Sequence, residues 1–594
     1  MCRIAGLLHP SLPISSIENT VQQMCDLQVH GGPDHGAIWS SPADQLCLGN
    51  RRLSLLDLTA GGNQPMQYAE RYTITYNGEL YNYLPLKDQL ESEGMVFSNH
   101  TDTEVILAAF SKWHTRCFSM LNGMFAFALW DNKEKSLYLV RDSAGIKPLY
   151  YSNHTGGIVF ASEIKAFQPV PYLQQAAANT AVFQLAYGFI PEPVTTLEHV
   201  WSLPKGCWMK YDSNRQTYSL QSFRFYSYSN DITGQATAIQ KVRASITDAV
   251  ERQMVADAPV GVFLSGGIDS AIIAGLANST KKKDLHTLSI NFKEEKYSEK
   301  KYQDLLAARL NSRHHSILLE EKEFHREFPE FLKAIDMPTC DGINTWFISK
   351  FAAAEGLKAV LSGVGADELF GGYPSFKRMN KALLLQRCPN ALLGLGGKIL
   401  DKKYRRISYL RIEGIRGLYL FLRGHFTTSE IADQLGAYEK DIWNILAGLP
   451  AAGLPDLLGS GNIASRMEFN LYMQDQLLRD ADVMSMANSL EIRVPFLDNE
   501  VIQTAFAISE DIKFDTVQKD LIIRAFSDEL PEEIWNRKKM GFSFPFAEWL
   551  SNSEYVKQLA QSNNKHTRKA CKDFYAGKLH WSRIMSLIVL KERA

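Results

Sequence analysis

An apolar strand signal that runs directly into a small-residue loop constrains this chain more than any other feature. Residues 260–264 are apolar throughout, the loop Ser-Gly-Gly-Ile-Asp-Ser follows at 265–270, and a helical pattern continues to 277. Two glycines permit a tight turn and bring main-chain N–H groups close to an anion, while the helix N-terminus adds partial positive charge. Asp269 can hold Mg²⁺ between phosphates. The segment predicts a nucleotide-phosphate loop, but not the GxxxxGK[ST] type, because no lysine precedes Ser270.

The rest of the chain divides into two regions of different texture. From about residue 236, apolar strands such as 285–290 and 359–361 alternate with longer helices, which indicates a parallel sheet with helices on both faces. Up to residue 167, short strands such as 72–76 are separated by turns. The stretch between the two regions is polar and contains several prolines. We therefore expect an α/β protein with a domain over 2–167, a connector over 168–235 and a domain over 236–594.

Charge and hydropathy exclude several classes of protein. The 594 residues carry 64 Lys and Arg against 65 Asp and Glu, so no overall charge attracts the chain to nucleic acid or to an anionic membrane. No apolar run approaches the ~20 residues that span a bilayer, and Pro10 and Pro13 interrupt the N-terminal apolar stretch. The helical segment 378–459 is moderately basic, which a solvated face explains better than nucleic-acid binding. We expect a soluble cytoplasmic protein without nucleic-acid or membrane partners.

The eight cysteines are scattered, without a CxxC pair or a Cys/His cluster. Neither a disulfide framework nor a zinc site is therefore expected. Cys2 stands apart because it follows the initiator methionine. If Met1 is removed, the chain begins with a thiol and an α-amine on one residue, and the amine, with a pKa near ~8, can act as general base for the thiol. The alternative is an accidental cysteine at a frayed terminus.

Other polar residues of the N-terminal region fit a site for an amino acid. Asn77 and Gly78 follow an expected strand, where a side-chain amide and a backbone N–H can form an oxyanion hole. Arg52 and Asp102 supply the opposite charges that hold a carboxylate and an ammonium group. Each has a plainer alternative, because Asn-Gly is a common turn, Asp102 can cap a helix over 103–112, and Arg52 can form a surface ion pair.

The N-terminal region resembles the glutaminase domain of glutamine-dependent asparagine synthetases. The resemblance lies in MCRIAGLL, GGPDHG, NRRLSLLD, YNGELYN, HTDTEV, GMFAFALWD and RDSAGIKPLYY, which occur in this order over residues 1–151. It implies an N-terminal-nucleophile fold, a four-layer α/β/β/α sandwich, in which Cys2 attacks the amide of glutamine and releases ammonia. The glutamine-binding positions implied are Arg52, Leu53, Asn77, Gly78, Glu79 and Asp102, with Asn77 and Gly78 also catalytic. Gly31 differs, because the family usually has arginine there.

The C-terminal region resembles the synthetase domain of the same family. Its motifs are LSGVGADELFGGY at 361–373, SMANSLEIRVPFLD at 485–498, and Lys519 with Arg537, Lys539, Gly541 and Phe542. The loop at 265–270 resembles that of the ATP pyrophosphatases, which implies a doubly wound parallel-sheet domain that cleaves ATP to AMP and pyrophosphate.

The second resemblance also implies positions for ATP and Mg²⁺. Those for ATP are Leu264, Ser265, Gly266, Gly267, Asp269, Ser270, Ile290, Ser362, Gly363 and Lys519. Asp269 and Asp367 would hold Mg²⁺. Lys519, which alone would pass for an exposed helix lysine, would be catalytic by neutralising phosphate charge as AMP forms.

Val364 is the departure from the family pattern that bears on the reaction. The family has Glu or Asp here, at the position that supports adenylation and takes a proton from ammonia as it attacks β-aspartyl-AMP. Valine has no lone pair and cannot act as a base. Either Asp367, Glu368 or Asp341 takes the role, or the acceptor carboxylate is not aspartate.

The resemblance therefore implies a glutamine-dependent asparagine synthetase. It would use glutamine, ATP and Mg²⁺ to convert L-aspartate to L-asparagine, with ammonia kept inside the protein between the two sites. The alternative is the same mechanism on another carboxylate, such as a uronic acid, a peptide or a natural-product acid. A binding or scaffold protein that has lost activity is the rival from another class. The partners expected are small molecules, and a homodimer is the assembly considered.

Overall fold

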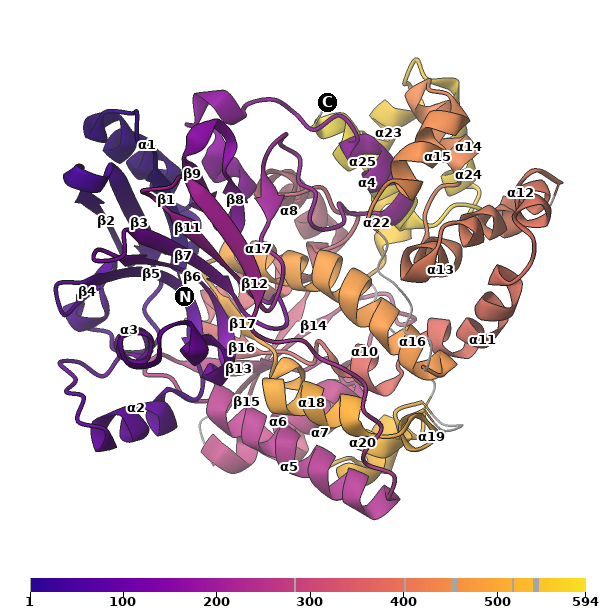
Figure 1. Ribbon diagram of the computed structural model, residues 1–594. Coiled ribbons are helices and arrows are strands. Elements are labelled where there is room, and N and C mark those ends of the chain that lie inside the picture. Colours follow the sequence, from indigo (N-terminus) through magenta and orange to yellow (C-terminus); the bar gives the residue numbers. More distant parts are fainter. Residues whose placement is uncertain are drawn as a thin grey trace.

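Three sheets organise the part of the chain that the structure describes. This is a computed structural model, and it describes residues 2–281, 285–399, 402–450, 458–514, 518–537 and 544–593. Figure 1 shows the two antiparallel sheets of the N-terminal part beside the parallel sheet of the C-terminal part.

Each sheet has six or five strands, whose order from one edge to the other differs from their order in the chain. The first antiparallel sheet holds β10 (Trp201–Ser202), β8 (Tyr150–Ser152), β9 (Ile158–Ala161), β1 (Cys2–Leu8), β3 (Leu46–Arg52) and β2 (His35–Ser41). The second holds β12 (Thr217–Ser222), β11 (Cys207–Asp212), β7 (Ser136–Arg141), β6 (Gly123–Asp131), β5 (Tyr72–Leu80) and β4 (Met66–Tyr68). The parallel sheet holds β15 (Arg313–Leu318), β14 (His286–Asn291), β13 (Val260–Phe263), β16 (Ala359–Leu361) and β17 (Glu491–Arg493).

The two antiparallel sheets pack face to face and carry helices on their outer sides. Strands β1 and β3 contact β5 of the opposite sheet, and apolar side chains such as Ile4 and Trp130 are fully buried between them. Helix α1 (Ile14–Asp26) covers β1 and β3, whereas α3 (Asp102–Trp113) covers β5, with α2 (Tyr83–Ser92) packed beside it. The predicted four-layer α/β/β/α sandwich is confirmed.

Strand β5 extends further than the sequence predicts. It pairs with β6 without interruption from Tyr72 to Leu80, so Asn77 and Gly78 lie inside a strand and the turn alternative for them is wrong. A Cβ atom on Gly78 would come within 2.2 Å of the main-chain oxygen of Met124. Glycine is therefore required here by the close approach of two strands.

Helix α3 begins one residue earlier than expected. Thr101 is its N-cap, since the Thr101 hydroxyl accepts a hydrogen bond from the Glu104 N–H at 3.2 Å. Asp102 is thus the first residue of the helix, and the N-cap expectation for it is wrong. Its carboxylate instead accepts hydrogen bonds from residues of β5.

The parallel sheet is covered on both faces, as the alternation of strands and helices predicts. One face carries α5 (Gln235–Gln253), α6 (Ile268–Lys281) and α7 (Lys300–Leu310), and the other carries α8 (Glu321–Ala334), α9 (Ile343–Ala354) and α17 (Arg479–Met486). In Figure 1 the first group lies below the strands and α8 and α17 lie above them. The doubly wound architecture is confirmed.

Residues 168–235, expected as a connector, do more than connect. Strand β10 joins the first antiparallel sheet and β11 and β12 extend the second, where β11 pairs with β7. Helix α4 (Thr180–Tyr187) instead packs against helices of the C-terminal part. The segment therefore completes the sandwich and also fastens it to the rest of the molecule.

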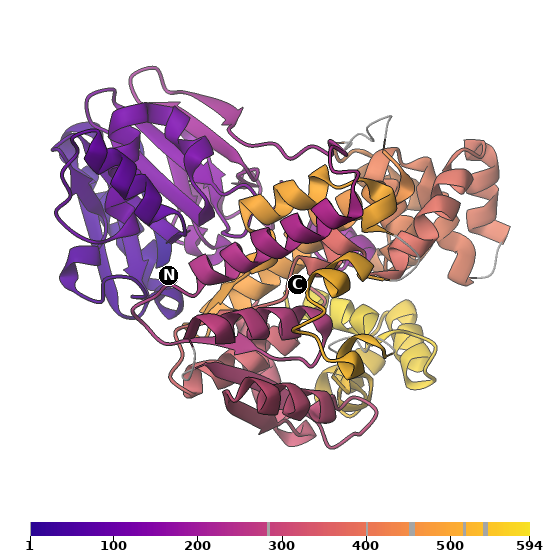
Figure 2. The ribbon, with the colours of Figure 1, turned by 90° about the horizontal axis from the view of Figure 1, so that it is seen from below.

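Most of the other helices lie at the end of the molecule away from the sandwich, as Figure 2 shows. These other helices are α10 (Ala366–Phe370), α11 (Pro374–Gln386), α12 (Asn390–Ile399), α13 (Gly414–Arg423), α14 (Thr428–Leu435), α15 (Glu439–Ala447), α16 (Ser460–Met467), α18 (Asn499–Ala507), α19 (Glu510–Lys513), α20 (Asp520–Ala525), α21 (Glu532–Trp535), α22 (Phe546–Ser551), α23 (Glu554–Ala560), α24 (Lys565–Tyr575) and α25 (Trp581–Glu592). Helix α18 is an exception, because its first residue, Asn499, donates from its side-chain amide to the Leu121 oxygen of the sandwich at 3.1 Å. A 3₁₀ stretch, Lys402–Arg411, follows α12, and a π-helix, Glu468–Leu478, precedes α17. Within the described ranges, no helix combines the length and the apolar character needed to span a bilayer.

A buried cluster of charges joins the sandwich to the C-terminal part. Arg3 donates to Glu163 Oε1 from Nε at 2.6 Å and to Asp482 Oδ2 from Nη1 at 2.7 Å, and Lys147 Nζ donates to Asp482 Oδ1 at 2.9 Å. Burial opposes ionisation of Asp482, but Arg3 and Lys147 outweigh it and lower the Asp482 pKa. Gly31 packs here too, since a Cβ atom on it would lie 2.6 Å from Arg3 Cγ. A larger residue at position 31 would displace the Arg3 side chain.

Candidate functional site

Cys2 lies at the start of β1 and faces a cavity between the two antiparallel sheets. Its neighbour across the sheet is Arg52 of β3, and its main-chain N–H donates to Asn77 Oδ1 of β5 at 3.3 Å. The residue is 6% exposed, and burial raises the pKa of its thiol. The nitrogen that would become the α-amine is thus held in place by the predicted oxyanion-hole residue.

The cavity brings together most of the residues predicted to bind glutamine. Cys2 lines it with Arg52, Leu53, Gly78, Glu79 and Asp102, while Asn77 touches Cys2 from β5. Sequence reasoning missed Gln64, Tyr76 and Thr101, which also line it. Tyr76 carried no clear signal, because it precedes Asn77 directly in β5 and neighbouring side chains of a strand point to opposite faces.

Arg52 and Asp102 are anchored differently at this cavity. Arg52 donates to the carbonyl oxygens of Leu56 at 3.1 Å and of Thr59 at 2.8 Å, so it holds the loop that closes one side. Asp102 accepts from the Tyr76 hydroxyl and the Leu80 N–H, both at 2.9 Å, and burial raises its pKa. Opposite charges therefore meet at one cavity, as the recognition of an amino acid requires. Their role in binding glutamine stays a prediction.

Glu79 links this cavity to the parallel sheet. Burial and the nearby Glu491 carboxylate raise the Glu79 pKa to about 8. Arg493 lies between the two carboxylates, with Nε 2.6 Å from Glu491 Oε1 and Nη2 3.7 Å from Glu79 Oε2. Side chains alternate between the two faces along a strand. Ile492, which lies between Glu491 and Arg493 in β17, therefore points to the opposite face, where it lines a second cavity.

The predicted nucleotide loop joins β13 to α6. Gly266 has φ +79°, a left-handed conformation that favours glycine. Ser270 Oγ accepts from the Ser265 N–H at 3.2 Å and donates to the Gly267 oxygen at 3.1 Å, which ties the loop into a compact turn. Arg537 donates to the Gly266 oxygen at 2.9 Å from outside. The strand, loop and helix agree with the prediction.

Lys519 lies between the two carboxylates predicted to hold Mg²⁺. Its Nζ is 2.6 Å from Asp269 Oδ1 and also pairs with Asp367, and the side chain is 4% exposed. Burial opposes protonation, but the two carboxylates outweigh it and raise the Lys519 pKa. The alternative of an exposed helix lysine is therefore wrong. Lys539, Gly541 and Phe542, from the same motif, lie outside the described residues.

The second cavity encloses about 1170 Å³, part of it open to solvent. Among the predicted ATP-binding residues, Leu264, Ser265, Asp269, Ser270, Ile290, Ser362 and Gly363 line it. Gly266 and Gly267 belong to the loop at its edge, and Lys519 reaches it through Asp269 and Asp367. The predicted ATP-binding residues, although they are spread from position 264 to position 519, thus lie around one site. Their contacts with ATP stay a prediction.

Further carboxylates line this cavity beside Val364. Burial raises the pKa of Asp341 to about 6, and burial together with Asp367 raises that of Glu368 to about 7. Sequence reasoning missed Asp480, whose pKa burial raises to about 8. Glu368 Oε1 accepts from the Tyr373 hydroxyl at 2.7 Å.

The donor set at Asp269 and Asp367 fits Mg²⁺. No group of three or more His, Cys, Asp or Glu in the described ranges is arranged to hold a metal by itself. Mg²⁺ in nucleotide sites is usually held by one or two carboxylates together with phosphate oxygens and water. Two carboxylates beside a phosphate loop meet that requirement.

Comparison with known proteins identifies the family. A family model named asparagine synthase matches residues 241–581, more than half of the chain. The chain belongs to the asparagine synthase family. A model for a glutamine amidotransferase domain matches residues 1–224, which includes β10 to β12. As an asparagine synthase family member, the chain is an ATP-dependent ligase that hydrolyses glutamine and uses its nitrogen to form an amide.

Relatives of this family member include both asparagine synthetases and amidases. The glutamine-hydrolyzing asparagine synthetase 1 of Bacillus subtilis (strain 168) is 32% identical, over 95% of this chain and 90% of the relative. Amidase chyE of Penicillium rubens is 26% identical, over 95% of this chain and 92% of the relative. Among solved structures, the glutamine phosphoribosylpyrophosphate amidotransferase of B. subtilis is 13% identical, with a TM-score of 0.30 over 53% of this chain and 81% of that chain.

Proposed function

We propose that this family member is an asparagine synthetase, which transfers ammonia from glutamine to an adenylated carboxylate with L-aspartate as the acceptor. The observation that carries the proposal is the pair of cavities, one with Cys2 between Arg52 and Asp102, the other with the phosphate loop beside Lys519. The similarity to the B. subtilis enzyme supports the choice of aspartate.

In the proposed first half-reaction, the Cys2 sulfur attacks the amide carbon of glutamine. Asn77 and the Gly78 N–H stabilise the oxyanion. The C–N bond then breaks, and the leaving NH2 group takes up the proton that the base removed from the thiol, so that it departs as ammonia. Water then hydrolyses the thioester to glutamate. Because burial raises the pKa of the thiol, a base is needed, and the α-amine freed by removal of Met1 supplies it.

In the proposed second half-reaction, the acceptor carboxylate attacks the α-phosphorus of ATP and pyrophosphate leaves. The 265–270 loop holds the phosphates, and Lys519 neutralises the charge that develops on them. Asp269 and Asp367 would hold Mg²⁺, which when bound neutralises phosphate charge. Ammonia then attacks the acyl carbon and AMP leaves.

We propose Glu368 as the group that replaces the acid lost at Val364. Asp367 is paired with Lys519 and is not available as a base. A pKa of about 7 suits a proton acceptor at neutral pH. The Tyr373 hydroxyl, bonded to Glu368 Oε1, holds the carboxylate in the cavity.

The second candidate is the same chemistry on another carboxylate, such as a uronic acid, a peptide or a natural-product acid. Two observations favour it: Val364, and the amidase named among the relatives.

Mass spectrometry of the products distinguishes the two candidates. Purified enzyme is incubated with glutamine, Mg²⁺, ATP and L-aspartate, and asparagine, AMP and pyrophosphate are quantified. Asparagine formed in equal amount to AMP supports aspartate. Glutamate released without asparagine rejects aspartate, and the same assay with a uronic acid and a peptide acid then tests the second candidate.

A further inference from the structure

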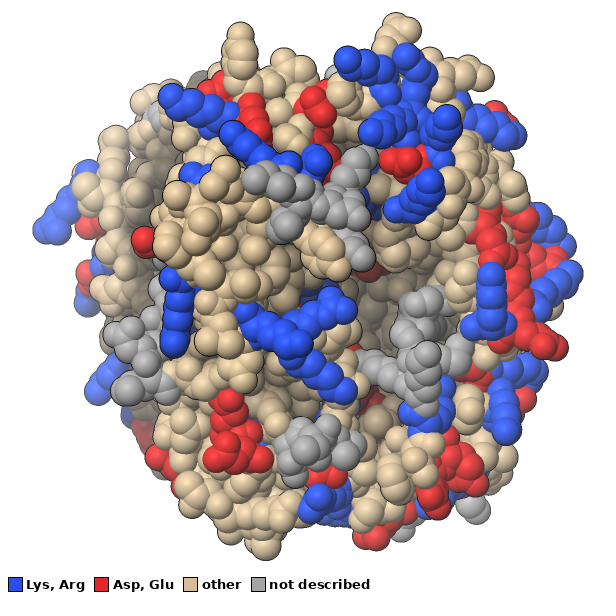
Figure 3. All heavy atoms as spheres, turned by 90° about the vertical axis from the view of Figure 1, so that its right-hand side faces the viewer, with Lys and Arg blue, Asp and Glu red and all other residues tan. Residues whose placement is uncertain are grey.

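A strongly basic segment follows the synthetase cavity in the chain. Between Pro374 and Arg411 the sequence holds ten Lys or Arg and one acidic residue, although the whole protein has a net charge of −1. The segment comprises α11, α12 and the 3₁₀ stretch after it. Figure 3 looks onto this side of the molecule and shows Lys and Arg side chains around uncharged ones. The charge is thus concentrated on one projecting group of helices.

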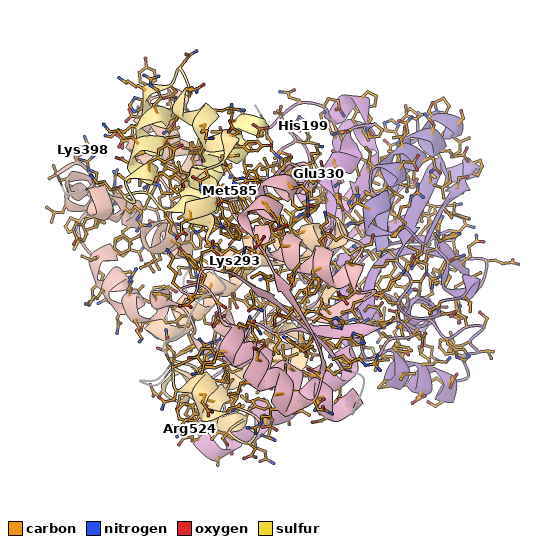
Figure 4. The ribbon with its side chains drawn as sticks, turned by 180° about the vertical axis from the view of Figure 1, so that it is seen from behind. His199, Lys293, Glu330, Lys398, Arg524 and Met585 are labelled. Atoms are coloured by element: carbon orange, nitrogen blue, oxygen red, sulfur yellow. The ribbon has the colours of Figure 1, made fainter. Side chains whose placement is uncertain are left out.

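The same helices expose large apolar side chains. Leu384 of α11 is 62% exposed, and Leu392 and Leu395 of α12 are 59% and 52% exposed. Residues three apart share a helix face, so Lys381 accompanies Leu384, and Lys398 continues the face of Leu392 and Leu395. Figure 4 shows Lys398 at the outer edge of the molecule. Leucines and lysines therefore point outward together.

A cavity beside α12 gathers three of these ten cations and adds Lys440. It has a volume of about 770 Å³, part of it open to solvent, and is lined by Lys398, Arg405, Arg411 and Lys440, with Glu439 as the acidic group. Glu439 Oε1 accepts from the Thr428 hydroxyl at 2.7 Å, and the Arg411 guanidinium lies 4.3 Å from the centre of the Trp443 ring. Four cations against one carboxylate favour an anionic group such as a lipid phosphate.

We propose that α11, α12 and this cavity form a docking surface for a bilayer that contains anionic lipids. Such a bilayer offers phosphates to the lysines and arginines and an acyl boundary to the leucines. Charge attraction and apolar insertion are each weak alone, and the surface supplies both. A duplex nucleic acid would use the cations but would leave the leucines in water. The surface differs from the solvated face expected from the sequence because its leucines are exposed.

Docking there would hold the synthetase cavity close to the membrane. Helix α11 begins at Pro374, directly after Tyr373 of that cavity. Leu384 follows ten residues later, about 15 Å along the helix. The site would then face carboxylates carried at a lipid surface. The docking itself does not depend on which acceptor the enzyme uses.

Sedimentation with lipid vesicles tests the proposal on the full-length enzyme. One set of vesicles contains phosphatidylcholine alone and the other adds phosphatidylglycerol. We expect the enzyme to sediment with the mixed vesicles, to be released by added salt, and to stay in solution with phosphatidylcholine alone.

Paired substitutions locate the surface. Lys381→Glu with Leu392→Ser should weaken binding to the mixed vesicles about tenfold or more. Lys241→Glu with Leu84→Ser changes the same residue types at exposed positions elsewhere and should leave binding unchanged. Glutamine hydrolysis should be unaltered in both variants, which shows that they are folded.

Two results would overturn the proposal. The first is sedimentation with the mixed vesicles no greater than with phosphatidylcholine alone, or equally weakened by both pairs of substitutions. The second is a dimer in solution, without vesicles, that the Lys381→Glu and Leu392→Ser pair dissociates. That outcome would assign the surface to a second copy of the chain.

Discussion

Cys2 is the single residue on which the proposed division of labour depends. Its replacement by alanine removes the nucleophile but leaves the second cavity untouched. We expect Cys2→Ala to abolish amide formation from glutamine, to below about 10⁻³ of the original rate, and to retain formation from added ammonia. Product quantification with each nitrogen source checks this, with Cys207→Ala on β11 as the control. Loss of both activities with ATP binding intact would contradict the proposed roles.

Glu368 makes a second prediction at this scale. A raised pKa of about 7 means that the carboxyl is protonated below pH 7 and becomes a base above it. The rate of ammonia-dependent amide formation, expressed per concentration of free ammonia, should therefore rise with pH through about 7.

The variant Glu368→Gln should lose that rise and slow amide formation by about 10²–10⁴-fold. Exchange of pyrophosphate into ATP should continue, because the phosphate loop is unchanged. Tyr373→Phe, which removes the hydrogen bond but not the base, should shift the midpoint of the profile with a smaller loss of rate. A profile for Glu368→Gln that keeps the inflection would assign it to another group.

Individual residues differ in how far the sequence could predict them. Cys2 and the 265–270 loop were accessible because their chemistry depends on chain position and on consecutive residues. Lys519 was predicted through the family resemblance alone, since a lone lysine gives no sign of the two carboxylates that surround it after folding. Asp480 was missed for the same reason, because its burial comes from helices distant in the chain.

In the β13–loop–α6 element, Gly266 has a backbone conformation that would strain a residue with a side chain. With φ +79°, an alanine there is strained by about 1 kcal/mol, and its Cβ would lie 3.2 Å from Tyr302 Cβ. We expect Gly266→Ala to raise the KM for ATP about tenfold and to leave glutamine hydrolysis unchanged. Gly275→Ala, within α6 where the nearest heavy atom is at 3.6 Å, should leave the KM as it is. Equal effects of the two would show that the loop does not hold the phosphates.

Whole elements were predictable where their pattern was local. The parallel strands follow from their apolar runs, and the short N-terminal strands follow from the turns between them. The four-layer sandwich was predicted from the family resemblance alone, and family models match both regions. Strands β11 and β12 were not recognised. Strand β12 is exposed along its whole length, so the alternation of Tyr218 and Leu220 with polar residues marks no buried face. It is specified by pairing with β11, a contact between strands that a single segment cannot show.

At the scale of the whole molecule, β17 is the wall between the two cavities. Arg493 and Glu491 face Glu79 of the cavity that holds Cys2, and Ile492 lines the cavity beside the 265–270 loop. Arg493→Lys keeps the charge but loses the fixed guanidinium geometry. We expect it to release more than one glutamate per amide formed, measured as the ratio of the two products. Lys358→Arg, at an exposed ion pair with Asp34, should keep the ratio of the original enzyme. A ratio of one in the Arg493→Lys variant would show that β17 does not couple the sites.

The ion cluster of Arg3, Asp482, Lys147 and Glu163 limits which chimeras of related enzymes can fold. Arg3 adjoins Cys2, and Asp482 lies two residues beyond Asp480, which lines the second cavity. A chimera that takes only one half from a relative would bring together positions 3 and 482 from different ancestors. Wherever those positions differ in charge, an ion would be stranded in the interior, so domain shuffling within the family is restricted to parents that share this pair.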